Sequence, residues 1–159
     1  MEKKYWEDFV IGDQITTQSI TITKAHLVNW AGLTMDFYPL HMDEEYAKKT
    51  IYGERIAHGP LIFSMAIGLM YMTGVYGDSI IAWLGVENMK IPAPVKIGDS
   101  IRVLARVSEK RKTKNPGRGV TKFHWYVKNQ RDETVMSLDY VLLMNGKHAP
   151  VLRENCVEV

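Results

Sequence analysis

The chain has 159 residues, of which 46% are hydrophobic and 24% are charged, and its formal net charge is +2. This length suits one domain with a sizeable core and is short for two, and the composition is that of a water-soluble globular protein. So small a net charge would imply a nucleic-acid partner only if basic residues were concentrated in one patch, and we expect no such partner.

The N-terminal residues and the cysteine content indicate in which cellular compartment the protein is expected. Residues 1–8 are rich in charge and no apolar run follows them, so we expect no secretory signal. Cys156 is the single cysteine, which excludes an intrachain disulfide and fits a reducing compartment. The uncharged stretch from Gly59 to Gly77 is interrupted by glycine, proline and serine, which favours a buried helix over a membrane span. We therefore expect a cytoplasmic protein without membrane contact.

The first third of the chain predicts one strand and two helices. Polar residues alternate with isoleucines from Ile15 to Ile22, a pattern typical of a strand. Thr23 suits the N-cap of a helix from Lys24 to about Leu33. Residues 34–40 contain a proline, which disfavours helical backbone before it, so we expect an irregular segment. Residues 42–49 begin with acids and end with lysines, as a short helix aligned with its dipole would.

The most apolar segment begins at Gly59 and Pro60. Proline is common at the first helical positions because its missing N–H would be unpaired there anyway. The residues that follow leave almost no polar face, so we expect a central helix that is covered on most sides. Phe63, Met65, Met70 and Met72 supply an adaptable apolar surface for a pocket.

The remaining chain predicts strands. The expected elements are an apolar strand at 79–85, an edge-like segment at 86–94, a half-buried strand at 101–108, a basic turn at 109–119, and strands at 120–128 and 134–144. The tail, residues 145–159, is polar and is expected to be irregular. We predict a single α+β domain over residues 1–159, with a curved antiparallel sheet wrapped around the apolar helix. Because one sheet cannot cover every side of that helix, we expect a homodimer or higher oligomer through the sheet edge.

Asp36 and His41 are the first candidates for chemistry. An imidazole titrates near neutral pH, and a nearby carboxylate can orient it or share a substrate water. The proline between them holds an irregular backbone that lets both side chains converge. The alternative is that Asp36 caps a turn and His41 satisfies a buried hydrogen bond, since this spacing is a weak pattern by itself.

His58, Gly59 and Pro60 form a second candidate group. A helix N-terminus presents unpaired N–H groups, and glycine lets a carbonyl oxygen approach them closely. Because proline has no N–H, the Gly59 N–H is the natural donor to an enolate or thioester oxygen. The alternative is an ordinary helix start. His58 either takes part in catalysis or packs, and Ser64 either reaches a substrate or bonds back to its own helix.

Other site classes find little support. His26, His124 and His148 are scattered, the histidines lack metal-ligand spacing, and one cysteine cannot build a thiolate site, so we expect no metal. Nucleotide-binding and serine-hydrolase motifs are also absent from the sequence, and we expect no bound cofactor. The basic run 110–114 with Arg118 is either a solvated hairpin or a contact for coenzyme or nucleic-acid phosphates.

At this point the residues resemble a known family, the MaoC-like dehydratases or R-specific enoyl-CoA hydratases. The resemblance rests on Asp36-Phe-Tyr-Pro-Leu-His41, on Ala47 and on Arg55-Ile-Ala-His-Gly59. It extends to the opening at residues 6–13 and to the segment 92–99. The combination is specific, although neither half would be.

The resemblance implies a hotdog fold, usually dimeric, and hydration of a trans-2-enoyl thioester of CoA or an acyl carrier. In that reading Asp36 and His41 activate the water, and the Gly59 N–H binds the thioester carbonyl. The acyl-CoA is then a substrate, and no other cofactor is needed. Tyr38 stands where the family has asparagine, so Tyr38, with His58 and Ser64, is a candidate substrate-binding residue.

Two alternatives remain open. A hotdog thioesterase would use the same N–H donor for hydrolysis. A non-catalytic acyl-CoA-binding or regulatory protein would keep only the pocket, and the tyrosine at position 38 is the feature that favours it. The acid/base pair of Asp36 and His41 favours the hydratase over the thioesterase.

Overall fold

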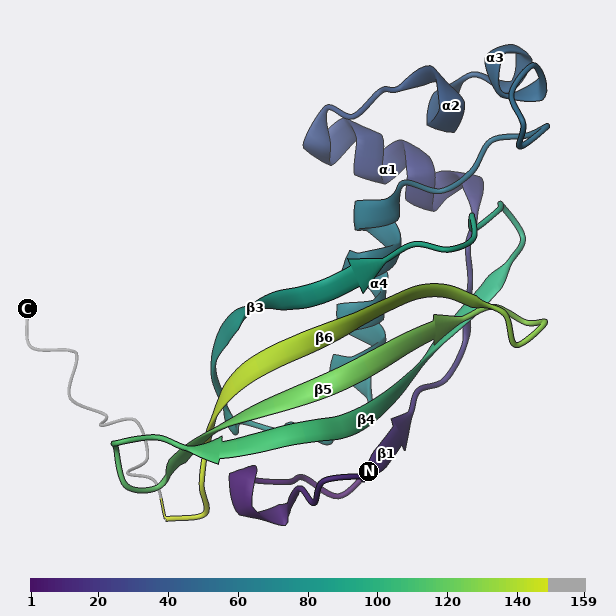
Figure 1. The fold of residues 1–159 in the computed structure, drawn as a ribbon. Coiled ribbons are helices and arrows are strands. Elements are labelled where there is room, and N and C mark those ends of the chain that lie inside the picture. The colour runs from purple at the N-terminus through teal and green to yellow at the C-terminus, as the bar shows by residue number, and fades with distance from the viewer. Residues whose placement is uncertain (149–159) are drawn as a thin grey trace, which may run out of the picture.

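A curved antiparallel sheet dominates the computed structural model, which describes residues 1–148 (Figure 1). Its strands are β1 (Gln14–Thr16), β2 (Ile20–Thr21), β3 (Ile80–Lys90), β4 (Ser100–Lys112), β5 (Arg118–Lys128) and β6 (Thr134–Asn145). The strand order is β1-β4-β5-β6-β3, and β2 pairs with β4. The irregular tail was predicted from residue 145, but Asn145 still belongs to β6, and residues 146–148 lie outside any strand or helix. The rest of the predicted tail, with Cys156, lies outside the described residues.

The helical elements are η1 (Trp6–Asp8), α1 (Lys24–Thr34), α2 (Pro39–Met42), α3 (Glu44–Lys48) and α4 (Gly59–Met72). The longest, α4, lies across the sheet, while α1, α2 and α3 gather at one of its ends (Figure 1). None of the helices within residues 1–148 is long and apolar enough to span a membrane. The expected α+β architecture, a curved sheet around a long apolar helix, is confirmed.

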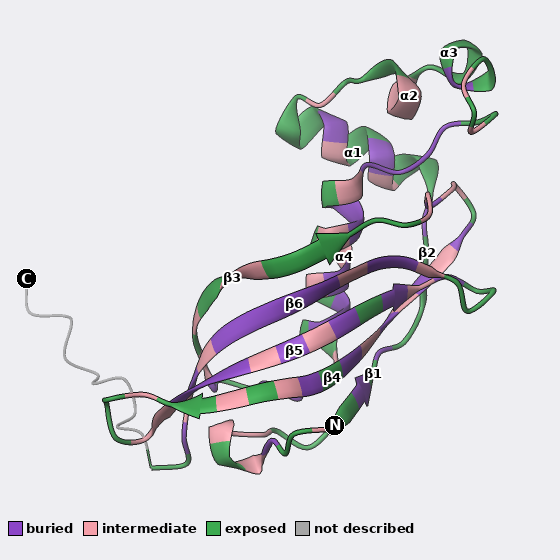
Figure 2. Cartoon of the chain, viewed as in Figure 1, coloured by how far each residue is buried: buried purple, intermediate pink, exposed green. Residues whose placement is uncertain are grey.

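The core forms between α4 and the inner face of the sheet. Ile62, Ala66 and Met70 repeat at helical spacing and are buried, so they make one continuous stripe. On β5, Phe123 and Trp125 alternate with more exposed residues, and both side chains are fully buried in this core. Buried residues concentrate along β4, β5 and β6, whereas β3 is largely exposed (Figure 2). Each large apolar side chain so buried stabilises the fold by roughly 1.5–3 kcal/mol.

The prediction that α4 is covered on most sides is only partly correct. Pro60, Ser64 and Gly68 are exposed along one stripe. Near the end of the helix Tyr71 is 66% and Met72 is 67% exposed. One chain therefore covers the sheet-facing side of the helix and leaves the other side open.

The strand predicted from Ile15 to Ile22 is interrupted. The Thr17 N–H still donates to the Val103 carbonyl at 3.0 Å, but the Val103 N–H donates to the Thr17 Oγ1, at 2.9 Å, instead of to a backbone oxygen. Because a side-chain oxygen replaces a backbone partner there, pairing with β4 stops at Thr16 and resumes at Ile20.

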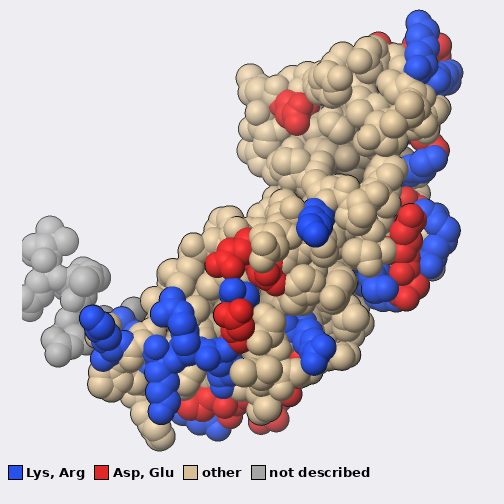
Figure 3. Space-filling model, viewed as in Figure 1, with Lys and Arg blue, Asp and Glu red and all other residues tan. Residues whose placement is uncertain are grey.

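Two other predicted boundaries differ from the structure. Pro39 does not stop helical geometry but begins α2, since its fixed φ suits a first helical turn. The basic run does not form a turn over its whole length. Residues 109–112 continue β4, because they pair with β5 as far as Gly119, and only residues 113–117 turn. Lysine and arginine side chains gather at that end of the molecule (Figure 3).

The predicted division between strand 79–85 and edge segment 86–94 is also wrong. Residues 80–90 form one strand, β3, which pairs with β6 and contains bulges. At one bulge Asn88 has a φ of 52°, so the ladder is interrupted without ending the strand.

Candidate active site

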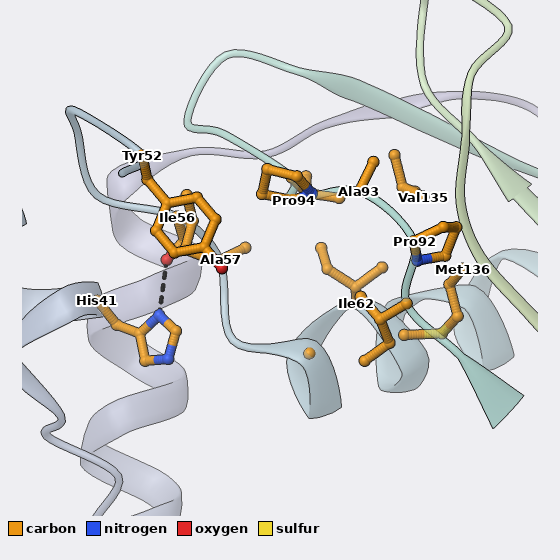
Figure 4. A pocket seen from close by; sticks show the side chains of 13 residues that line it. His41, Tyr52, Ile56, Ala57, Ile62, Pro92, Ala93, Pro94, Val135 and Met136 are labelled. Atoms are coloured by element: carbon orange, nitrogen blue, oxygen red, sulfur yellow. Dashed lines mark hydrogen bonds between the residues drawn. The ribbon is translucent and has the colours of Figure 1, made fainter. Parts of the chain in front are cut away.

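A cavity of about 280 Å³ lies at the N-terminus of α4 (Figure 4). His41 stands at one end and Met136 at the other. The lining residues are His41, Tyr52, Ile56, Ala57, Gly59, Ile62, Ile91, Pro92, Ala93, Pro94, Val95, Val135 and Met136. One imidazole and one helix N-terminus therefore open into a largely apolar chamber, which is the usual character of a small-molecule site.

His41 is oriented by a backbone carbonyl. Its Nδ1 lies 2.8 Å from the Ile56 carbonyl oxygen (Figure 4). A carbonyl oxygen only accepts hydrogen bonds, so Nδ1 carries the proton and donates it. The Nε2 of the neutral ring is then left with a lone pair that can take up a proton. This arrangement prepares His41 for general acid–base chemistry.

His58 packs beneath His41 and does not line the cavity. Its side chain is fully buried, and the two ring centroids are 4.0 Å apart. Its Nε2 donates to the Asp36 carbonyl oxygen at 3.0 Å, which joins the start of α4 to the segment before α2. Burial lowers the pKa of His58 despite the opposing effect of that hydrogen bond, so the ring is neutral at pH 7. His58 thus holds the backbone of Asp36 in place.

Asp36 stands next to these two rings. It follows Met35, whose φ of 63° turns the chain sharply after α1. One ligand atom from each of Asp36, His41 and His58 lies within 4.8 Å of the other two. The fold therefore brings the carboxylate and His41 together, as the sequence predicted. The same three groups are numerous enough to bind a divalent cation, so the expectation of no metal, drawn from spacing in the sequence, stays a prediction.

Gly59 is the first residue of α4. The first backbone bond of the helix runs from the Ile62 N–H to the His58 carbonyl, so the Gly59 N–H precedes the helical ladder. A Cβ at this position would stand 2.9 Å from Ile91 Cδ1. Glycine therefore allows the strap at residues 91–95 to pass close to the helix N-terminus, and Gly59 itself lines the cavity.

The other two predicted residues lie outside the cavity lining. Tyr38 is 53% exposed, its ring stands edge-on to His41 at 6.0 Å, and its hydroxyl is 3.4 Å from that of Tyr46. Ser64 lies on the exposed stripe of α4. Their roles in substrate binding stay predictions.

Several lining residues were missed from the sequence. Phe63, Met65, Met70 and Met72 do not line this cavity, and the helix contributes Ile62 instead. Tyr52, Val135 and Met136 come from a loop and from the start of β6, so no local pattern marks them. The prolines of the 91–95 strap were the one available signal, because they restrict the backbone beside the site.

Comparison with known proteins agrees with this arrangement. The family model described as MaoC like domain matches residues 8–126. The chain is 42% identical to Protein MaoC of Klebsiella aerogenes over 70% of its own length, but spans only 32% of that protein. It is 35% identical to an (R)-specific enoyl-CoA hydratase of Rhodospirillum rubrum, over 65% of this chain and 69% of the relative.

A solved structure agrees as well. A protein from Archaeoglobus described as a monoamine oxidase regulatory protein superimposes with a TM-score of 0.84 at 38% identity, covering 91% of this chain and 95% of the other. The model match extends over more than half of the chain, and the sheet and helix take the arrangement predicted above. The chain therefore belongs to the MaoC-like domain family and has the hotdog fold.

Proposed function

We propose that this protein is a hydratase/dehydratase that adds water reversibly to a trans-2-enoyl thioester to give a 3-hydroxyacyl thioester. The observation that carries the proposal is that the oriented ring of His41 and Gly59 at the start of α4 line one apolar cavity. Asp36 is not among the lining residues, but its carboxylate lies within 4.8 Å of a ring nitrogen of His41. Relatives named as enoyl-CoA hydratase and 3-hydroxybutyryl-CoA dehydratase support the reaction class.

In the proposed reaction, Asp36 and His41 hold a water molecule between them. His41 Nε2 accepts a proton from that water as its oxygen bonds to the β-carbon of the enoyl group. The electron pair of the carbon–carbon double bond moves toward the thioester carbonyl. The α-carbon then takes up the proton that the Asp36/His41 pair removed from the water, which returns the pair to its starting protonation. The added atoms are those of one water molecule, so the reverse reaction is a dehydration by the same groups.

The Gly59 N–H is the proposed donor to the thioester oxygen. Negative charge develops on that oxygen as the water adds, and a fixed donor in an apolar cavity stabilises it more than it stabilises the ground state. The apolar side chains that line the cavity, among them Ile62, Val135 and Met136, leave room for the acyl chain. In this proposal the thioester is a substrate and the chain's own groups carry out the reaction.

A non-catalytic acyl-CoA-binding protein is the second candidate. It is favoured by Tyr38, which occupies the place of the family's asparagine and stands edge-on to His41. A tyrosine there would narrow the approach to the imidazole. Such a protein would bind an acyl-CoA in the same cavity without turning it over.

Two substitutions test the proposal. Asp36→Asn and His41→Ala should each lower the rate of crotonyl-CoA hydration by about 10²–10⁴-fold, because each removes a partner in proton transfer. Circular dichroism and thermal unfolding check that both variants fold. His148→Ala is the matched control, since His148 is an exposed histidine outside the cavity. Turnover at the wild-type rate in either site variant would defeat the assignment.

A further inference from the structure

A second cavity, of about 240 Å³, is lined by part of the same loop, residues 52–57, that borders the catalytic cavity. Its lining residues are Lys24, Glu44, Lys48, Gly53, Glu54, Arg55 and Ile97. The loop divides its side chains between the two cavities. Tyr52, Ile56 and Ala57 line the catalytic one, and residues 53–55 line the second. Consecutive residues of one loop therefore line both cavities.

A buried arginine, Arg55, lines the second cavity and has a hydrogen-bond donor without a partner among the described residues. Its side chain is only 9% exposed, and its Nη2 donates to Glu44 Oε1 at 3.0 Å. Its Nε is buried and has no hydrogen-bond partner within residues 1–148. Leaving a buried charged donor unpaired is costly, and the guanidinium has further donors to offer. A planar guanidinium of this kind is suited to bidentate recognition of a phosphate.

The charges around Arg55 favour an anion. Three cations, Lys24, Lys48 and Arg55, line the cavity beside two acids, Glu44 and Glu54. Lys48 is paired with Glu45 outside the lining at 2.6 Å, and Glu54 is paired with Lys96 at 2.7 Å. Glu44 uses a single oxygen, Oε1, to accept from both Lys24 and Arg55, each at 3.0 Å. Because the Glu44 side chain is 54% exposed, it can turn toward solvent when a stronger anion enters.

We propose that this second cavity binds the phosphate groups in the nucleotide half of a coenzyme A thioester, with Arg55 and Lys24 as the principal contacts. The identity of the ligand rests on the proposed function, since the thioester end would occupy the catalytic cavity. The flexible pantetheine arm joins the two ends around the shared loop. The site thereby selects a CoA thioester over a substrate that lacks the nucleotide.

The test compares crotonyl-CoA with crotonyl-pantetheine, which has no phosphate or nucleotide. The double variant Lys24→Gln/Lys48→Gln should lower kcat/KM for crotonyl-CoA on the order of tenfold more than for crotonyl-pantetheine, and mainly through KM. Glu44→Gln should have the opposite effect on crotonyl-CoA and lower its KM, because the substitution removes the carboxylate that competes with the phosphates for Arg55 and Lys24. Lys49→Gln is the control, since Lys49 is exposed on the same loop but outside the lining.

Direct binding separates this inference from the proposed reaction. Calorimetry with 3′,5′-ADP should show salt-sensitive binding to the wild type that weakens in the lysine variant and strengthens in Glu44→Gln. Such binding without turnover of any thioester would sustain the phosphate site and reject the hydratase. Equal losses on both crotonyl substrates, or no binding of 3′,5′-ADP by the wild type, would overturn the phosphate site.

Discussion

The ring of His41 is oriented by a carbonyl oxygen fifteen residues further along the chain. The Ile56 carbonyl fixes which ring nitrogen carries the proton, and His58 fixes the Asp36 backbone from the same segment. The sequence named Asp36 and His41 as candidates, and the structure places their side chains close together, while their acid/base role stays a prediction. The sequence did not predict the groups that orient them, since those contacts form only when the segment before α4 packs against α2.

Gly59 provides a second residue-level test. Gly59→Ala would place a Cβ against Ile91 Cδ1, the end of a side chain that is 53% exposed. Because that side chain can move, the free energy of unfolding should change by less than about 1.5 kcal/mol. We expect kcat/KM for an enoyl thioester to fall, since the displaced Ile91 and the added methyl both crowd the cavity. Adding Ile91→Ala to Gly59→Ala should recover part of that loss, and no recovery would show that the crowding explanation is wrong.

At the scale of elements, α1 was predicted to within a residue because Thr23 suits its N-cap. The start of α4 was predicted from Gly59 and Pro60 and from the apolar run that follows them. No local sequence pattern predicts the bulges of β3 or the break between β1 and β2. They depend on which residue of the neighbouring strand lies opposite, which is a property of the sheet and not of the segment.

Three strands are tied together by one carboxylate. Asp139 on β6 accepts from Asn88 Nδ2 of β3 at 2.7 Å and from His124 Nδ1 of β5 at 2.6 Å. Burial by itself raises the pKa of Asp139, but the two hydrogen bonds outweigh it and hold that pKa below its ordinary value. The carboxylate therefore stabilises the fold above the unfolded pKa of about 3.9, and this contribution is lost as the pH falls through the folded pKa.

Asp139→Asn tests that account by chemical denaturation across a pH series. The variant should be less stable than the wild type by about 1–3 kcal/mol at pH 7, and the difference should narrow below about pH 4. Asp78→Asn is the control, since Asp78 forms an exposed pair with Lys3 and should change stability little. A difference that is constant with pH would contradict the proposed role of the ionised carboxylate.

At the scale of the whole molecule, the open edge of β3 is the feature left unexplained by a single chain. Ile81, Trp83, Leu84 and Met89 are all exposed on it, between 36% and 51%. An apolar strand edge of this length invites pairing with another strand. We propose that two copies associate through β3, as the sequence analysis expected from the incomplete cover of α4.

A charge placed on that edge tests the association. Leu84→Lys should shift the mass measured by sedimentation from dimer toward monomer, because it buries a lysine without a partner in the proposed interface. Val28→Lys on α1 is the control, since Val28 is also 50% exposed but lies away from the edge. If Leu84→Lys remains a dimer, the interface lies elsewhere on the molecule. If the wild type is a monomer, the proposed interface does not exist.

The reaction itself is tested most directly by following crotonyl-CoA with the wild-type protein, reading the enoyl thioester absorbance and free thiol in the same sample. The account predicts that the absorbance falls while no thiol is released, because water adds to the double bond and the thioester stays intact. Release of thiol would contradict it in favour of a thioesterase. Tight binding of crotonyl-CoA and of longer enoyl-CoAs with no change in either signal would contradict it in favour of a binding protein.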